Sequence, residues 1–215
     1  IHRSDAEASY LLGLPHGGLA FYVAAIREAF EESGILLARR RGESQQPDFS
    51  EPTMANRFQQ HRDALNNREQ DFISILQQED LMVDAGAMHY VARWITPPGP
   101  PRRFDARFFV ARIPARQTPN HDNHELVHSR WMTPHEILGK FAADEMSLMV
   151  PTLQMIKNLS LFRTAEEVMT AAAANLPDER VRLIPESTDI VMPGEPGYDA
   201  ATEEVESGWI RLRPI

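Results

Sequence analysis

The chain has 215 residues, of which 42% are apolar and 25% are charged, which is typical of a globular protein with a sizeable core and excludes disorder throughout. The formal net charge is −9, which argues against nucleic acid and anionic membrane surfaces as partners. The sequence contains no cysteine, so disulfides, thiolate metal sites and cysteine nucleophiles are excluded. Because no apolar run approaches about 18 residues and no leader pattern opens the sequence, we expect no membrane span, no signal peptide and a cytoplasmic location.

The N-terminal third is predicted to be mainly helical. Residues 1–15 read as irregular, and the loop Pro-His-Gly-Gly at 15–18 leads into a helix over about 19–33, with Gly34 as its C-terminal stop. The polar stretch at 39–52 contains three helix breakers and is predicted to be a solvated connection. Two helices are expected after it, at about 53–65 and 68–78.

The middle of the chain favours strands. Residues 88–95 alternate as in a strand, the proline-rich stretch 96–103 predicts a turn, and 104–114 reads as the strand partner. A polar loop at 115–125 and a third short strand at 126–132 are expected next. Thr133, Pro134 and Glu136 then have the form of a helix start, with a capping box and proline at the first position.

The C-terminal third is predicted to contain helices over about 148–161 and 164–174, followed by short strands at 190–194 and 209–215. Strands and helices mix without a regular βαβ alternation. This pattern favours the α+β class.

An unusual concentration of acid lies on the first long helix. Glu28, Glu31 and Glu32 fall within about 100° of arc at helical periodicity, while Val23, Ile26 and Phe30 take the opposite side. The preceding arginine is four residues from the second of these acids and can orient its carboxylate. Two interpretations remain open from spacing alone: a site for a hard divalent cation, which prefers clustered carboxylate oxygens, and a solvated acidic face.

The stretch AAIREAFEESGIL resembles the second half of the Nudix box. The matching positions are Arg27, Glu28, Ala29, Glu31, Glu32, Gly34 and Ile35. In the first half Gly13 fits the pattern, whereas Leu19 stands where the family has a glutamate. The sequence is most similar to the coenzyme A diphosphatase-like subgroup of the Nudix 19 type, in which an insertion splits the box. The stretches at 92–97, 103–114 and 124–138 agree with that subgroup.

This resemblance implies a Nudix fold of the α+β class, with a mixed sheet between helices. We expect a Nudix domain over 1–160 with a helical insertion at about 44–80, and a C-terminal extension over 161–215 packed on the same domain. The family begins with strands before the acidic helix, so these strands are missing here and a further segment is expected before Ile1.

The resemblance also implies an activity: hydrolysis of a diphosphate linked to another moiety, with Mg²⁺ or Mn²⁺. By position, Glu28, Glu31 and Glu32 become metal ligands, and Arg27 becomes the residue that orients Glu31 for catalysis. The favoured substrate is coenzyme A or acyl-coenzyme A, and a homodimer is the partner that the family implies. NADH, ADP-ribose and nucleotide sugars remain competing small-molecule substrates, because loops outside the helix select the substrate.

Two other classes of function stay open. The departure at Leu19 is compatible with a catalytically silent Nudix module that binds a nucleotide or a partner protein. The helical segments 53–78 and 148–175 could instead make the chain a helical interaction protein.

Three further residues are predicted to belong to the site. Glu125 is the candidate general base, as the resemblance implies a carboxylate from this loop. Arg103 and Arg107 share one side of the strand at 104–114 and are candidate contacts for substrate phosphate. The alternative for both arginines is the solvated charge of an edge strand.

His121, His124 and His128 invite a zinc interpretation, but a loop-forming sequence surrounds them and favours a surface cluster. Trp94 and Trp131 are expected to pack in the core or in a cleft wall.

Overall fold

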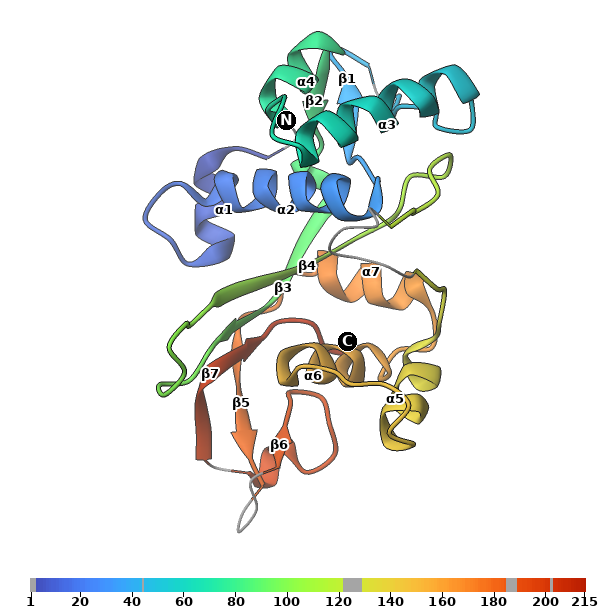
Figure 1. Ribbon diagram of the computed structural model, residues 1–215. Helices are drawn as coiled ribbons and strands as arrows, with labels where there is room; N and C mark the ends of the chain where they lie inside the picture. Colours follow the sequence, from blue (N-terminus) through green and yellow to red (C-terminus); the bar gives the residue numbers. More distant parts are fainter. Residues whose placement is uncertain (1–2, 44, 122–128, 185–188, 202) are drawn as a thin grey trace. The chain divides into compact units, whose positions relative to one another are not determined.

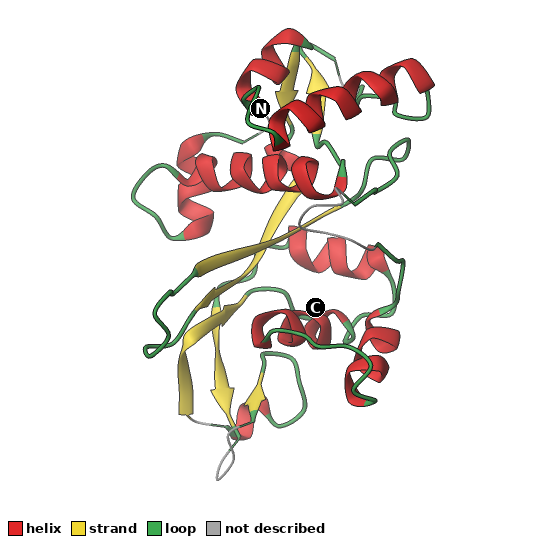
Figure 2. Ribbon diagram, in the orientation of Figure 1, coloured by secondary structure: helices red, strands yellow, loops and turns green. Residues whose placement is uncertain are grey.

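The computed structural model describes residues 3–43, 45–121, 129–184, 189–201 and 203–215. The chain forms two compact units: residues 1–88 with 111–130, and residues 89–110 with 131–215. Both units combine helices and strands (Figure 2), which confirms the α+β class. Within the described ranges, none of the helices has the length and apolar character needed to cross a bilayer.

Helices dominate the first unit (Figure 1). Its elements are α1 (Asp5–Leu12), α2 (Gly18–Ser33), β1 (Ala38–Arg40), α3 (Pro52–Asn66), α4 (Phe72–Gln78), β2 (Leu81–Val83) and the short 3₁₀ helix η1 (Ala85–Ala87). The helices predicted at 19–33 and 53–65 agree with α2 and α3. The one predicted from residue 68 begins four residues later, at Phe72, because Asp71 caps it by accepting from Ser74 N.

Helix α1 corrects the expectation that residues 1–15 are irregular. Ser4 accepts a hydrogen bond from the Glu7 backbone, and the Glu7 side chain accepts from the Ser4 backbone at 2.7 Å. This reciprocal pair satisfies two amide groups that an isolated helix start would leave unpaired. The Ser-x-x-Glu pattern at 4–7 was therefore the sequence signal for this helix.

Helix α1 caps the N-terminus of α2. The Asp5 carboxylate accepts hydrogen bonds from Gly17 N at 2.9 Å and Leu19 N at 3.0 Å, and Ser9 Oγ accepts from Gly18 N at 2.9 Å. A β-carbon at Gly18 would lie 2.3 Å from the backbone nitrogen of Ser9. Only glycine therefore allows the two helices to approach this closely, which explains the second glycine of the loop at 15–18.

The apolar face of α2 forms part of the first unit's core. Tyr22, Ile26 and Phe30 are spaced four residues apart and are all at most 1% exposed. Phe30 contacts the rings of Phe58 on α3 and Phe72 on α4, with centroids 6.4 and 6.3 Å away. Burial of these large side chains fixes the rotation of α2, and its charged residues must then lie on the other side.

Strands β1 and β2 pair antiparallel and were missed by the sequence prediction, which assigned 39–52 wholly to a solvated connection. Each strand has three residues, too short for alternation to be recognised. Arg39 in β1 donates to the carboxylate of Asp84, which is 1% exposed and follows β2 directly. Tertiary packing thus makes a strand of a stretch whose sequence is polar.

The second unit contains the larger sheet, with strands in the order β4-β3-β7-β5-β6. Figure 1 shows α6 and α7 beside this sheet. Its elements are β3 (Met88–Ile95), β4 (Asp105–Ala111), α5 (Pro134–Ala142), α6 (Val150–Leu159), α7 (Ala165–Ala173), β5 (Glu179–Leu183), β6 (Ile190–Val191), the 3₁₀ helix η2 (Tyr198–Ala200) and β7 (Glu203–Ile210).

Several predictions for this unit are confirmed and others are wrong. The strand at 88–95 has the predicted bounds, β4 lies within 104–114, and Thr133 begins α5 with the expected capping box. The strand predicted at 126–132 does not form over its described part, 129–132. Strand β5 was not predicted, since its sequence ERVRL is mostly charged. The strand predicted at 209–215 overlaps only the end of β7, which stops at Ile210, and of the strand predicted at 190–194 only Ile190 and Val191 form one.

The core of the second unit lies between the sheet and helices α6 and α7. Trp94 in β3 is 4% exposed and belongs to this core, together with Met155 of α6 and Ala171 of α7. Gly208 of β7 pairs with Trp94, and a β-carbon there would come within 2.8 Å of the indole ring. The expectation for Trp131 is wrong, because this side chain is 74% exposed.

Residues 161–215 take part directly in the sheet. Strand β7 pairs antiparallel with β3 through Ala92↔Ile210, and with β5 through Glu179↔Ile210. The domain boundary expected at residue 160 stays a prediction.

Candidate functional site

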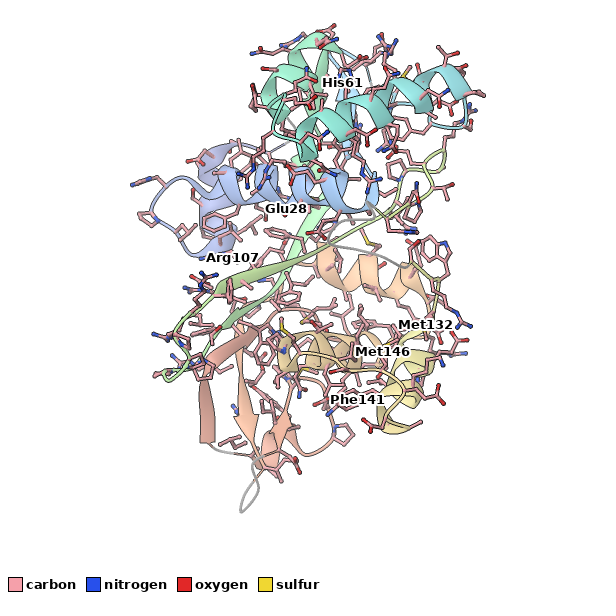
Figure 3. All side chains as sticks on the ribbon, in the orientation of Figure 1. Glu28, His61, Arg107, Met132, Phe141 and Met146 are labelled. Atoms are coloured by element: carbon pink, nitrogen blue, oxygen red, sulfur yellow. The ribbon has the colours of Figure 1, made fainter. Side chains whose placement is uncertain are left out.

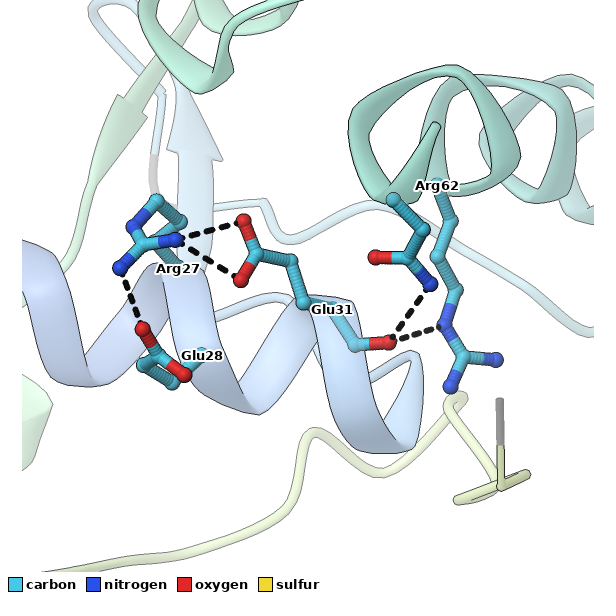
Figure 4. A network of polar contacts seen from close by, with 5 residues as sticks. Arg27, Glu28, Glu31 and Arg62 are labelled. Atoms are coloured by element: carbon cyan, nitrogen blue, oxygen red, sulfur yellow. Dashed lines mark hydrogen bonds and ion pairs between the residues drawn. The ribbon is translucent and has the colours of Figure 1, made fainter. Parts of the chain in front are cut away.

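The charged side of α2 carries a hydrogen-bonded network. Arg27 Nη1 donates to both carboxylate oxygens of Glu31, at 2.7 and 2.8 Å, and Arg27 Nη2 contacts Glu28 (Figure 4). One guanidinium thus separates two carboxylates one helical turn apart and offsets their repulsion. The contact that the sequence predicted between Arg27 and Glu31 is present.

The charge of Arg27 is fixed by this environment. Partial burial of the guanidinium would lower the pKa of Arg27, but the hydrogen bond and charge of Glu31, followed by those of Glu28, raise that pKa overall. Arg27 is therefore a permanent cation between the acids.

The C-terminal end of α2 is held by α3. Arg62 is 2% exposed, and it donates from Nε to the carbonyl oxygen of Glu31 at 2.9 Å and from Nη2 to that of Glu32 at 2.6 Å. Asn66 Nδ2 reaches the Glu31 carbonyl at 3.3 Å. Figure 4 shows the side chain of Glu31 facing Arg27 while its backbone oxygen faces Arg62. A buried cation thus satisfies carbonyls that the end of a helix leaves unpaired, at the negative end of its dipole.

A second segment meets the same helix end. The backbone nitrogen of Asn120 donates to the carbonyl of Ser33 at 2.9 Å, and Gly34 closes the helix with a left-handed φ of 71°. A β-carbon on Gly34 would lie 3.4 Å from Arg62 Nη1. This distance is an ordinary van der Waals contact, so the glycine of the sequence motif is needed for its left-handed φ, which stops the helix.

The acidic side of α2 lines a cavity of about 1090 Å³, and its other wall is the connection between α3 and α4. The lining contains two arginines and five acids, so negative charge predominates. The residues are Arg27, Glu28, Glu31, Glu32, Leu65, Asn66, Asn67, Arg68, Glu69, Gln70, Asp71, Phe72 and Ser74. The three glutamates of the motif therefore face one polar space together with the helical insertion predicted at 44–80.

A buried histidine of α3 contacts side chains in the connection between α3 and α4 and just after α4. His61 lies on α3 (Figure 3) and is 7% exposed. Its Nδ1 is 3.0 Å from Gln70 Oε1 and its Nε2 is 2.9 Å from Glu79 Oε1. Gln70 is thereby tied to the helix while it lines the cavity.

The residues that line this cavity fit a hard divalent cation by donor chemistry. Glu28, Glu31 and Glu32 supply carboxylate oxygens, which Mg²⁺ and Mn²⁺ prefer, and the cavity leaves room for water and substrate oxygens. In the described part of the chain, no three His, Cys, Asp or Glu side chains are already gathered around one point. Glu28 and Glu31 are instead drawn to Arg27, so ion binding would require their carboxylates to turn.

Other predicted site residues fall elsewhere. Glu125, His124 and His128 lie outside the described residues. His121 Nδ1 is 3.3 Å from Ser129 Oγ, so the imidazole of His121 has a polar side-chain partner.

Arg103 and Arg107 lie in the second unit, whereas the glutamates lie in the first. Arg107 on β4 (Figure 3) has a side chain that is 4% exposed, with Nη1 3.5 Å from Asp105. Arg103 Nε donates to the carbonyl of Thr96 at 2.8 Å, across the proline-rich turn. Both arginines thus have structural contacts of their own.

Two residues of the first unit's site were missed by the sequence prediction. Arg62 occupies the apolar side of α3, four residues after buried Phe58 and three before buried Leu65, and this spacing was the available signal. Arg68 follows the end of α3, at a backbone position that no sequence pattern marked.

A family model and two curated relatives of this chain all point to the same family. The sequence model of the NUDT19 Nudix domain matches residues 4–159. The chain is 30% identical to human acyl-coenzyme A diphosphatase NUDT19 over 176 residues, which cover 78% of this chain and 44% of the human protein. For the protein of the same name from Xenopus laevis, identity is 27% over 171 residues, covering 76% and 45%. The chain spans less than half the length of these relatives.

A solved structure is also similar. The crystal structure of a Nudix hydrolase from Alicyclobacillus acidocaldarius superposes with a TM-score of 0.52 and is 28% identical, covering 69% of this chain and 64% of that chain. With the acidic helix, its capped ends and the match over residues 4–159, the chain belongs to the Nudix family of the NUDT19 type.

Proposed function

We propose that the protein is a metal-dependent hydrolase that cleaves the diphosphate bond of coenzyme A or acyl-coenzyme A. The observation that carries this proposal is the exposure of Glu28, Glu31 and Glu32 to a single cavity, with Arg27 bound to the central acid of the group. The names of the relatives, acyl-coenzyme A diphosphatases, support the substrate class. Nudix hydrolases generally use divalent metal ions, and the oxygen-only donor set supports Mg²⁺ or Mn²⁺.

In the proposed reaction, water attacks one phosphorus of the diphosphate and the bond to the bridging oxygen breaks. Two phosphate monoesters and a proton result. When bound, the divalent ion neutralises the diphosphate and lowers the pKa of the attacking water. Glu28, Glu31 and Glu32 would hold the ion once the carboxylates of Glu28 and Glu31 turn towards it. Arg27, which donates two hydrogen bonds to Glu31 in this structure, is proposed to orient that side chain. Capping at both ends keeps α2 from fraying and so preserves this arrangement.

The remaining roles are assigned to residues beyond α2. Glu125 is proposed as the general base that takes the proton of the attacking water. Arg103, which precedes β4, and Arg107, which lies within it, stay proposed contacts for substrate phosphate, supported by the planar donors of arginine.

The test is product analysis with purified protein, coenzyme A and Mg²⁺ or Mn²⁺. We expect adenosine 3′,5′-bisphosphate and 4′-phosphopantetheine, with the reaction stopped by chelator and restored by excess metal. NADH, ADP-ribose and a nucleotide sugar are assayed in parallel, and faster turnover of one of these would move the substrate assignment. Binding of these compounds without any hydrolysis would contradict the proposal and favour a silent binding module.

A further inference from the structure

We propose that Arg68 is a substrate-binding residue that contacts a phosphate group of the substrate from the wall opposite the acidic helix. Arg68 lines the same cavity as Glu28, Glu31 and Glu32, from the connection between α3 and α4. This inference deepens the proposed function and rests on it, since it concerns the same diphosphate site.

The backbone at Arg68 is held in an unfavourable conformation. Its φ is 60°, in the left-handed region. The other described non-glycine residues with positive φ are Asp80, Asp144 and Asn175, and aspartate and asparagine tolerate this region better than arginine does. Residues held in such conformations are concentrated at active sites and ligand-binding sites, so the conformation of Arg68 points to a function.

The surrounding hydrogen bonds explain what imposes this conformation. Arg68 N donates to the carbonyl of Leu65 at 3.0 Å, and Glu69 N donates to that of Ala64 at 2.8 Å. This pattern ends α3 as a Schellman motif, whose left-handed position is usually occupied by glycine. Glycine would therefore satisfy the backbone at position 68 better than arginine, and the side chain needs another explanation.

The side chain of Arg68 is available to a ligand. Arg68 is exposed, and among the described residues no hydrogen bond or ion pair engages its guanidinium. Arg27, the other arginine in the lining, is already bound to Glu28 and Glu31. Of the two arginines among the described lining residues, Arg68 is thus the one whose guanidinium can bind an incoming anion.

The charge balance of the cavity favours such a cation. Acids outnumber arginines in the lining, so a diphosphate entering the cavity meets net repulsion that bound metal relieves on the α2 side only. The planar fork of arginine donates two parallel hydrogen bonds to a phosphate. Either the diphosphate itself or the 3′-phosphate of coenzyme A supplies this chemistry.

The experiment compares Arg68→Gly and Arg68→Gln with wild type. Arg68→Gly is expected to raise the melting temperature, because glycine relieves the left-handed strain, and yet to raise KM for coenzyme A about tenfold. Arg68→Gln is expected to raise KM similarly without this gain in stability. Arg40→Gln, which removes an exposed arginine from β1 outside the cavity lining, is the matched control and leaves both quantities unchanged.

Two substrates separate the sources of the phosphate. If Arg68 contacts the 3′-phosphate, the rise in KM appears with coenzyme A and not with dephospho-coenzyme A. If it contacts the diphosphate, both substrates show the rise. An unchanged KM for both substrates in Arg68→Gly and Arg68→Gln would overturn the inference.

A binding measurement keeps this test independent of hydrolysis. Calorimetric titration with methylenediphosphonate and coenzyme A in Mg²⁺ compares wild type with Arg68→Gly. A weaker affinity of the variant for either compound supports the role of Arg68 even if the wild type hydrolyses nothing, a result that would refute only the proposed function. If wild type and variant have equal affinities for both compounds and equal KM values, the substrate-binding role of Arg68 is refuted, while the proposed function is unaffected.

Discussion

Arg62 Nε lies 2.9 Å from the carbonyl oxygen of Glu31, so an arginine of the helical insertion holds the backbone of a residue whose side chain faces the cavity. The same guanidinium reaches the carbonyl of Glu32. The insertion therefore supports the last turn of α2 and also forms the opposite wall of the site. Removal of the insertion would therefore destabilise the last turn of α2, in addition to removing one wall of the site.

Replacement Arg62→Met keeps the apolar stem of the side chain and removes its donors. We expect the free energy of unfolding to fall by about 3 kcal/mol, because two helix-end carbonyls lose a charged partner inside the protein. Denaturant titration measures the change. Arg116→Met, which removes a mostly exposed arginine paired with Asp48, is the control and is expected to cost less than about 1 kcal/mol. Equal losses for the two variants would show that the contact is not specific to the helix end.

Two glycines of the chain give opposite predictions for the same substitution. Gly18→Ala places a methyl group against the α1 backbone and is expected to destabilise the protein by about 3 kcal/mol. Gly139→Ala lies within α5 with open space around it and is expected to stabilise by about 0.5–1 kcal/mol. Thermal unfolding of both variants checks the pair. A stable Gly18→Ala protein would contradict the close packing of α1 on α2.

Asp105 provides a prediction for acid stability. Hydrogen bonds from Arg93 Nε and Nη2 hold the pKa of Asp105 below its usual value of 3.8. A carboxyl whose folded pKa is depressed stabilises the fold above its unfolded pKa, and this contribution is lost as pH falls through the folded pKa. The difference in unfolding free energy between wild type and Asp105→Asn should therefore be present at pH 7 and should close below about pH 3.8.

The size of this difference is expected to stay below about 1 kcal/mol, since Asp105 has a side chain that is 42% exposed and solvent screens the pair. Urea titrations at neutral and acid pH measure it. Gly139→Ala, a substitution in the same unit that removes no ionisable group, is the control, and its effect should be the same at both pH values. A difference that grew towards acid pH would have the wrong sign.

Glu125→Gln tests the proposed general base. We expect kcat for coenzyme A hydrolysis to fall by about 10²–10⁴-fold, because proton transfer to a positioned base is lost, with Mn²⁺ affinity unchanged. Steady-state kinetics and a metal titration of the same preparation make the comparison. Unchanged turnover would remove Glu125 from the mechanism.

Periodicity in the sequence was sufficient for the elements that pack on one face. In α2, the residues Tyr22, Ile26 and Phe30 bury one side, and the sequence therefore predicted both the helix and the side of it that packs in the core. The strand at 88–95 was predicted with its bounds for the same reason: alternation reports a sheet whose faces differ in burial. Capping boxes were equally informative at Thr133, and they would have been at Ser4.

The partners of the acidic helix could not be predicted. Arg62 and Asn120 meet the end of α2 across 31 residues and 87 residues of chain, respectively, and local patterns carry no information on such contacts. Strand β5, with the sequence ERVRL, forms because β7 and β6 pair with it on either side. Because most of its residues are charged, its sequence shows no hydrophobic alternation from which the strand could be predicted.

A Mn²⁺ titration followed by electron paramagnetic resonance, with wild type, Glu31→Gln and Glu43→Gln, shows directly whether the acidic face of α2 binds a divalent ion. We expect wild type and Glu43→Gln, whose substitution lies outside the cavity, to bind Mn²⁺ equally, and Glu31→Gln to bind it at least tenfold more weakly. Equal binding by all three proteins would contradict a metal site on the acidic face of α2.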